Sequence, residues 1–126
     1  MLTVHERGLL QNIIKHCEKI ETKMSITDRE KFNGDEDLRE IICFNLFQIG
    51  ELAKNFSSEF IKEYSSSPWK QIKGMRDKIG HGYGTIDLDK VWSTAQDDIK
   101  PLHEYCKMIL DKNPISEKSQ KEAKRG

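Results

Sequence analysis

The chain has 126 residues, which is enough for one domain with a buried core. Its 21 basic and 21 acidic residues balance, so no overall positive charge indicates binding to nucleic acid. No apolar run approaches the roughly 18–20 residues that span a bilayer, and the start of the chain lacks the basic and apolar regions of a signal peptide. These features predict a cytoplasmic protein that does not interact with a membrane.

The three cysteines, Cys17, Cys43 and Cys106, are odd in number and far apart in the sequence. None belongs to a Cys-x-x-Cys pair, and each falls within an apolar helical stripe, so we expect buried free thiols in a reducing compartment. No cysteine or histidine has a second ligand at the spacing of a zinc site. The sequence therefore predicts neither a metal nor a cofactor.

Apolar residues recur at spacings of three and four, and β-branched alternation is absent, which predicts an all-α chain. The first helix is expected over residues 3–24. A capping box at Thr27 to Glu30 predicts a short turn that ends near Gly34. A second long helix should follow, with three acids at its positive N-terminal end. The expected apolar stripe of the first helix comprises Leu9, Leu10, Ile13, Ile14, Cys17 and Ile20, and that of the second comprises Leu38, Ile41, Ile42, Leu46, Ile49, Leu52, Ala53 and Phe56.

Serines before Pro68 predict a break and then a third helix that begins at this proline. That helix should unwind at the glycines from Gly80 to Gly84. Asp87 is the expected N-cap of a fourth helix, which Pro101 should kink or split. We place the domain over residues 1–112 and expect a polar, frayed tail over 113–126.

Positive charge collects around an arginine and a histidine in the third helix. Residues 69–83 carry Lys70, Lys73, Arg76 and Lys78 against Asp77 alone, an excess that can attract an anion, although an ordinary solvated helix face has the same composition. Arg76 falls at the edge of the apolar stripe formed by Ile72, Met75 and Ile79. A guanidinium there needs a carboxylate such as that of Glu51, an aromatic ring, a subunit boundary or an anionic ligand.

His81 follows Arg76 by five residues, and an ideal helix would turn it about 140° away. Gly80 and Gly82 allow the helix to end between the two side chains, so that both could face one site. The helix dipole favours the protonated imidazole and the nearby arginine opposes it, which suits an acid–base catalyst near neutral pH. A histidine in this position can also be a simple C-terminal cap.

The segment from Arg76 to Tyr83 resembles the Arg-x4-His-x-Tyr motif of the HEPN superfamily, and specifically its HepT-like toxins. Three other segments, residues 44–53, 68–76 and 86–92, resemble the family's second helix, its approach to the motif and the region after it. The resemblance covers roughly residues 3–110. The residue after the arginine, often asparagine in relatives, is Asp77 here, which keeps the polarity and adds a negative charge.

The resemblance implies an antiparallel HEPN-type bundle of about four main helices that forms a homodimer, with two motifs meeting at the dimer boundary. It implies a toxin of a prokaryotic toxin–antitoxin module, acting as a metal-independent endoribonuclease. Arg76 would stabilise charge on the phosphoryl oxygens, His81 would transfer protons, and Asp77 would support them. Lys70, Lys73 and Lys78 would hold flanking phosphates of the RNA substrate.

Tyr83 corresponds to the tyrosine that a partner antitoxin of this family, a minimal nucleotidyltransferase, modifies with AMP. The flanking glycines would expose its hydroxyl, and the added phosphate would block RNA from the groove. A larger hetero-oligomer with the antitoxin is a further expectation. The other interpretation of Tyr83 is packing over the end of the bundle.

Two rival functions remain open at this point. In one, the protein is a non-catalytic nucleotide- or substrate-binding subunit that pairs with a minimal nucleotidyltransferase. In the other, it is a helical dimer in which the motif is purely structural. The remaining polar and aromatic candidates are interpreted as solvated, boundary or core residues: Asp97, Asp98, His5, His16, His103, Trp69 and Trp92.

Overall fold

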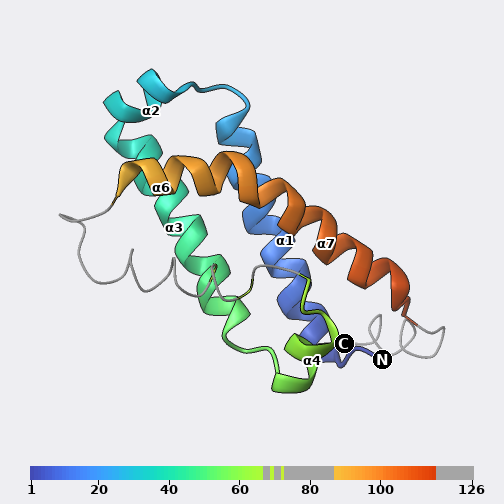
Figure 1. Ribbon diagram of the computed structural model, residues 1–126. Coiled ribbons are helices and arrows are strands. Elements are labelled where there is room, and N and C mark those ends of the chain that lie inside the picture. Colours follow the sequence, from blue (N-terminus) through green and yellow to red (C-terminus); the bar gives the residue numbers. More distant parts are fainter. Residues whose placement is uncertain (67–68, 70–71, 73–86, 116–126) are drawn as a thin grey trace.

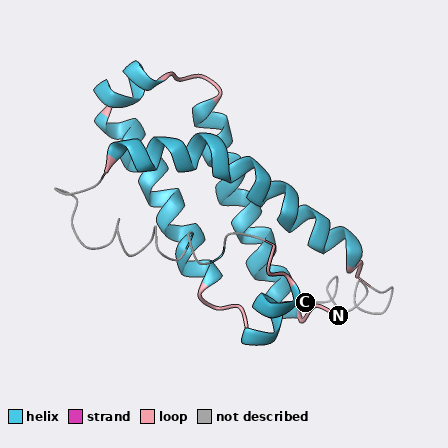
Figure 2. Cartoon of the chain, in the orientation of Figure 1, coloured by secondary structure: helices cyan, strands magenta, loops and turns pink. Residues whose placement is uncertain are grey.

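The computed structural model describes residues 1–66, 69, 72 and 87–115. These residues contain helices and no strand (Figure 2), which confirms the all-α prediction. The elements are α1 (Val4–Met24), α2 (Arg29–Gly34), α3 (Glu36–Ala53), α4 (Ser58–Glu63), α6 (Leu88–Ser93), the π-helical turn η2 (Thr94–Asp98) and α7 (Ile99–Lys112). Most of the predicted third helix, and the tail from residue 116, lie outside the described residues.

Side-chain caps fix where the helices begin. Thr3 and Glu6 form a capping box at the start of α1, with both reciprocal hydrogen bonds 3.0 Å long. Asp35 caps α3 by accepting from the Leu38 N–H at 3.0 Å. At α2 the predicted Thr27–Glu30 box is wrong, because the N-cap is Asp28, which accepts from the Lys31 N–H at 2.8 Å.

The second long helix is shorter than predicted, and a separate short helix follows it. Helix α3 ends at Ala53, and Ser57 then caps α4 by accepting from the Phe60 N–H at 3.1 Å. Phe60 is buried and stacks on Phe56, with ring centroids 4.1 Å apart. The sequence pattern missed α4 because one buried aromatic in six residues leaves no helical period to detect.

The core lies where α1 packs against α3 on one side and α7 on the other (Figure 1). Helices α1 and α3 run antiparallel, and α6, η2 and α7 form one continuous rod. The fully buried side chains at the centre of the core include Leu10, Ile13, Cys17, Ile20, Phe32, Ile42, Leu102, Cys106 and Ile109. This arrangement agrees with the predicted apolar stripes of the two long helices, except at one position.

Ile41 is the exception, since it is 40% exposed and not part of the core. Cys43 and Asn45 are buried on α3 instead. The buried face of α3 is centred on Ile42, Leu46, Ile49 and Ala53, and Ile41 projects roughly 110° from the centre of this face, beyond its edge. The expected stripe was therefore one position too wide.

The predicted kink or split is not found at Pro101, because α7 runs through this residue and the π-helical turn η2 lies just before it. Pro101 is the third residue of α7, directly after η2. A π turn changes which carbonyl faces each N–H, so the missing proline donor and the bulk of its ring are accommodated within the rod. In the part of the chain that the structure describes, no helix combines the length and hydrophobicity needed to cross a membrane.

Candidate functional site

The predicted catalytic and binding side chains lie outside the described residues. They are Lys70, Lys73, Arg76, Asp77, Lys78, His81 and Tyr83, so their predicted roles stay predictions. The structure does describe residues on both sides of this segment, Trp69 and Ile72 before it and Asp87 after it. The described part of the candidate site therefore consists of the residues that flank this segment. We call them its two anchors: Trp69 with Ile72 before it, and Asp87 after it.

Trp69 is the first anchor, and its indole is buried at 2% exposure. The indole Nε1–H donates to the Tyr64 carbonyl oxygen at 2.8 Å. The rings of Phe56, Phe60 and Tyr105 surround it, with centroids 5.1, 6.1 and 6.4 Å from its own. Since a buried indole with a satisfied N–H has no free face for a base, the prediction that Trp69 belongs to the core is confirmed.

Ile72 lies three residues after Trp69 and is also buried, at 7% exposure. Both residues are helical, so they place one face of the predicted third helix against the core. Ile72 was predicted to begin the stripe on whose edge Arg76 falls four residues later. The described start of that stripe agrees with the prediction.

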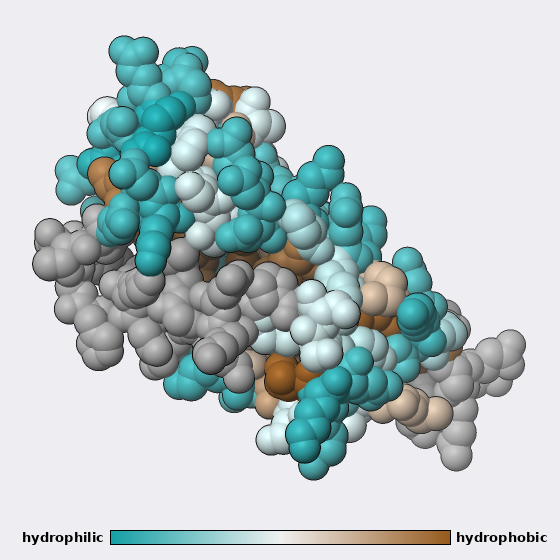
Figure 3. Space-filling view, viewed as in Figure 1, coloured by the Kyte–Doolittle hydropathy of each residue, from teal (hydrophilic) through white to brown (hydrophobic). Residues whose placement is uncertain are grey.

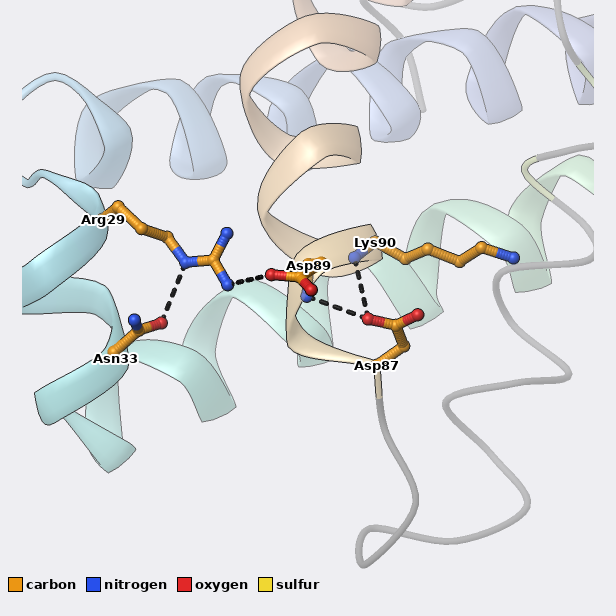
Figure 4. A network of polar contacts seen from close by, with 5 residues as sticks. All are labelled: Arg29, Asn33, Asp87, Asp89 and Lys90. Carbon is orange, nitrogen blue, oxygen red and sulfur yellow. Dashed lines mark hydrogen bonds and ion pairs between the residues drawn. The ribbon is translucent and has the colours of Figure 1, made fainter.

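Asp87 is the second anchor, four residues after Tyr83. One carboxylate oxygen accepts from the backbone N–H groups of Asp89 and Lys90 at 3.0 and 3.3 Å (Figure 4). This is the N-cap predicted from the sequence. Helix α6 begins at the next residue, Leu88, and Val91 is buried in the core.

Arg29 of α2 joins this second anchor to the rest of the fold. Its guanidinium pairs with the Asp89 carboxylate, and its Nε–H donates to Asn33 Oδ1 at 2.9 Å (Figure 4). It also lies 6.0 Å from the centroid of the Trp92 ring, which packs on Phe32 at 5.2 Å. Sequence reasoning missed this contact, because nothing in the chain marks residues sixty positions apart as partners.

Two histidines interpreted as surface or boundary residues have specific partners. His16 Nδ1 lies 2.8 Å from Asn45 Oδ1, and the Asn45 amide donates to the Ile41 carbonyl oxygen at 2.8 Å. His103 Nδ1 lies 2.5 Å from a Glu21 carboxylate oxygen. The sequence signal that could have revealed the His16–Asn45 pair is Asn45 itself, a polar residue at a buried position of α3. Both pairs join α1 to a neighbouring helix.

The described residues offer no second catalytic centre. Asp97 and Asp98 are both exposed in η2, as predicted. Partial desolvation of the Asp98 carboxyl group, and to a lesser degree the neighbouring Asp97 charge, raises the pKa of Asp98 above its usual range. A groove of about 390 Å³ beside η2 is lined by Glu21 and Asp28 as well as by Arg29 and Lys100. Its opposite charges cancel, so it does not favour an anion.

The cysteines behave as structural residues. All three are free and buried, as predicted. Burial raises the pKa of Cys106 to about 12 and raises the pKa values of Cys17 and Cys43 as well. A buried neutral thiol is a poor nucleophile and a poor metal ligand. Across the described ranges, no three His, Cys, Asp or Glu side chains are grouped as metal ligands would be.

Comparison with known proteins gives one consistent result. The family model "Ribonuclease HepT-like" matches residues 13–109, a range that includes both anchors and the whole segment between them. A protein of Caldanaerobacter subterraneus subsp. tengcongensis named "Putative RNase" is 35% identical over 106 residues, which cover 84% of this chain and 95% of the relative. "Probable ribonuclease HepT" of Thermococcus cleftensis is 31% identical over 96 residues, covering 76% and 87%.

A third relative, from Methanocaldococcus jannaschii and also named "Putative RNase", is 30% identical over 115 residues, covering 86% of this chain and 95% of its own. None of the solved structures matches this chain. The relatives are therefore similar over nearly their whole lengths, and the likeness extends well beyond the short motif.

Proposed function

This chain belongs to the HepT-like ribonuclease family, and from that membership we propose that it is an RNA endonuclease whose reacting residues are Arg76 and His81. One observation carries the proposal. The family match covers residues 13–109, and the Arg76–Tyr83 motif falls inside it, between the anchors at Trp69 and Asp87. The described residues on either side of the motif, Trp69 and Ile72 before it and Asp87 after it, belong to the same folded domain, which agrees with the extent of the family match.

The proposed reaction needs no metal ion. The 2′-hydroxyl oxygen of RNA attacks the adjacent phosphorus, the bond from phosphorus to the 5′ oxygen breaks, and a 2′,3′-cyclic phosphate and a 5′-hydroxyl result. His81 transfers a proton from the attacking oxygen or to the leaving oxygen, and Arg76 stabilises the charge that grows on the phosphoryl oxygens. Such preorganised charge is worth about 2.7–4 kcal/mol per donor in other enzymes.

The other charged residues of the segment have supporting roles in this proposal. Lys70, Lys73 and Lys78 bind phosphates on either side of the scissile one, which makes binding weaken as salt rises. Asp77 sits beside Arg76 in sequence and orients its guanidinium through a charge-assisted hydrogen bond. These residues give affinity and orientation without base specificity.

Tyr83 is the proposed point of control. A small nucleotidyltransferase, acting as antitoxin, would transfer AMP from ATP to the Tyr83 hydroxyl and release pyrophosphate. The new phosphodiester adds negative charge two residues from His81 and excludes RNA by repulsion and bulk. Incubation with ATP, Mg²⁺ and such an enzyme should add the mass of one or more AMP groups to the wild type and none to Tyr83→Phe.

The rival function is a nucleotide-binding subunit without catalysis, in which the same arginine and histidine only hold a phosphate. A substrate with a single 2′-deoxy nucleotide at the cleavage position separates the two. Under the nuclease proposal this substrate still binds but is not cut, whereas the all-RNA substrate yields cyclic-phosphate ends. Binding of both substrates without cleavage of either, by unmodified protein, would favour the rival.

A further inference from the structure

The two tryptophans of the chain are held in different ways. Trp69 is buried and its indole N–H is bonded, whereas Trp92 of α6 is only partly buried. The fully buried Phe32 packs against Trp92, and another part of the indole lines the groove of about 390 Å³ beside η2. Within the described residues the Trp92 Nε1–H has no hydrogen-bond partner. The structure therefore places Trp92 between the core and the groove, with a donor that the fold does not use.

The groove has an apolar wall. It lies where the connection between α1 and α2 faces the rod formed by α6, η2 and α7 (Figure 1). Trp92, Met24 and Ala95 are the apolar residues that line it. On the face drawn in Figure 3, by contrast, hydrophilic side chains cover most of the described surface. An apolar and aromatic wall with a few polar groups is typical of a site for a small or planar ligand.

Three side chains of the rod follow one another along the groove. Trp92, Gln96 and Lys100 are spaced at intervals of four, and all three line the groove. Successive members lie about 6 Å apart along the rod, given a rise of about 1.5 Å per residue. Gln96 belongs to η2, and π-helical turns inside α-helices are frequent at functional sites. In the part of the chain that the structure describes, neither the Gln96 amide nor the Lys100 ammonium makes a hydrogen bond or an ion pair.

The other charged residues of the groove are already engaged. Glu21 pairs with His103, and Asp28 is the N-cap of α2. Arg29 pairs with Asp89 (Figure 4). Two carboxylates in the lining repel a phosphate from the interior, whereas a neutral planar group avoids this repulsion. The groove therefore favours a neutral ring inside and leaves Lys100 for a phosphate at its edge.

We propose that this groove binds one unpaired base of the RNA substrate, stacked on Trp92, and that it prefers adenine. Proteins recognise single-stranded bases by stacking on aromatic rings or guanidinium planes and by hydrogen bonds to the base edges. The Arg29 guanidinium, 6.0 Å from the Trp92 ring centroid, offers a second plane. The Gln96 amide can accept from N6 and donate to N7 of adenine. Lys100 binds the phosphate of the same nucleotide, and the Trp92 N–H is a further donor for it.

The inference rests on the proposed function, since it names a base that the proposed nuclease holds. Trp92 follows Tyr83 by nine residues, the last four of them within α6. Five extended residues and four helical rises span at most about 24 Å. A short single strand can therefore occupy the groove and the Arg76–Tyr83 motif at the same time.

The first test is the tryptophan fluorescence of the full chain during titration with oligonucleotides whose 2′-hydroxyls are all methylated, which bind but cannot be cut. The adenine oligonucleotide should quench the emission of Trp92, while Trp69 is shielded in the core. Trp92→Phe should remove this quenching, and circular dichroism should show that the variant is folded. Saturated binding of a labelled oligonucleotide by the wild type, measured by anisotropy, without any quenching would overturn the proposal.

The second test separates base recognition from phosphate binding. Gln96→Ala should bind the adenine oligonucleotide about tenfold more weakly and a uracil oligonucleotide as well as the wild type does. Lys100→Gln should weaken binding of both and lower the salt dependence by about one phosphate contact. Gln11→Ala and Lys107→Gln, at exposed positions outside the groove, should change neither affinity. Unchanged adenine binding by Gln96→Ala would overturn the base assignment.

The same chemistry could come from a free nucleotide, and 5′-AMP tests that source. It should bind at least about tenfold more weakly than the oligonucleotide, because it lacks the flanking phosphates. Binding of AMP as tight as that of the oligonucleotide would assign the groove to a free nucleotide and overturn its assignment to RNA.

RNA cleavage is assayed separately, so the two proposals fail independently. Cleavage by the wild type and by Gln96→Ala with the same base preference would overturn this inference and leave the nuclease intact. Quenching that depends on Gln96, without cleavage of any RNA, would sustain this inference and refute the nuclease.

Discussion

The Trp69 indole N–H donates to the Tyr64 carbonyl oxygen at 2.8 Å, and the ring is almost completely buried. Tyr64 is the C-cap residue of α4, so this bond joins the end of that helix to the start of the next helical residues. It leads the chain out of α4 and into the core just before the Arg76 segment.

Replacement of Trp69 should be among the most destabilising single changes in the described core. Trp69→Ala should lower the free energy of unfolding by about 3–5 kcal/mol, because it leaves a cavity among three aromatic rings. Trp69→Phe keeps much of the packing but leaves the Tyr64 carbonyl without its indole donor, and should cost less. Urea denaturation checks both values. Equal costs for the two variants would mean that the hydrogen bond and not the packing dominates.

The buried Asn45 should contribute more to stability than its partner His16. Asn45→Ala removes two hydrogen bonds, one to His16 and one to the Ile41 carbonyl oxygen, and should cost about 1–3 kcal/mol. His16→Ala removes only the first bond and should cost less. In the double variant the two costs should not add, since both include the shared bond. Simple additivity in urea denaturation would show that the two side chains do not interact in solution.

At the start of α6, the cap should matter more than the ion pair. Asp87→Ala removes the acceptor of two backbone N–H groups and should cost about 1 kcal/mol. Asp89→Ala breaks the pair with Arg29, but the Asp89 side chain is 82% exposed, so the cost should stay near the low end of 0–1 kcal/mol. Thermal unfolding at low and high salt checks the order. A larger effect for Asp89, strongly reduced by salt, would contradict it.

The buried thiols should make the protein less stable at alkaline pH. In the unfolded chain a cysteine loses its proton near its ordinary pKa of 9.0, whereas burial raises the pKa of Cys106 to about 12 in the folded state. Between these values the unfolded state binds fewer protons, so stability falls as pH rises, by at most about 1.4 kcal/mol per pH unit for one thiol. This contribution is fully present below pH 9.

The measurement is the slope of the unfolding free energy between pH 9 and pH 11, with wild type and Cys106→Ala compared. The alanine variant should be less stable at pH 8 but should lose stability less steeply above pH 9. Identical slopes would show that the Cys106 thiol titrates normally in the folded protein. Alkylation of native protein at pH 8 should likewise leave Cys17 and Cys106 unmodified until it unfolds.

Much of the fold followed from local signals that need no tertiary information. Apolar spacing predicted α1, α3 and α7, and Asp87 was predicted as the N-cap that starts α6. The acids at the N-terminal end of α3 were predicted from the helix dipole, and the structure shows that Asp35 is its N-cap. The apolar pattern gave wrong or missing predictions at positions where tertiary packing determines the structure. Ile41 is apolar but lies outside the face that contacts α1, and α4 is too short to carry a period of its own.

The candidate site divides in a similar way. The motif from Arg76 to Tyr83 was predicted from the types and the order of its residues. This information is contained entirely in the local sequence. The contacts that hold its flanks were not predicted, because Arg29 with Asp89 and Trp69 with Tyr105 are joined only by the folded chain. Family membership supports ribonuclease chemistry but leaves the roles of individual side chains to experiment.

The most direct test of the central claim is RNA cleavage in excess EDTA by purified wild type and by folded His81→Ala. The intact mass of each sample must first show that no AMP group is attached, since a silenced nuclease would resemble an inert protein. We predict that the unmodified wild type cuts RNA without metal and that the variant has lost nearly all of this activity. Unmodified, folded wild type that leaves several classes of RNA intact would contradict the account.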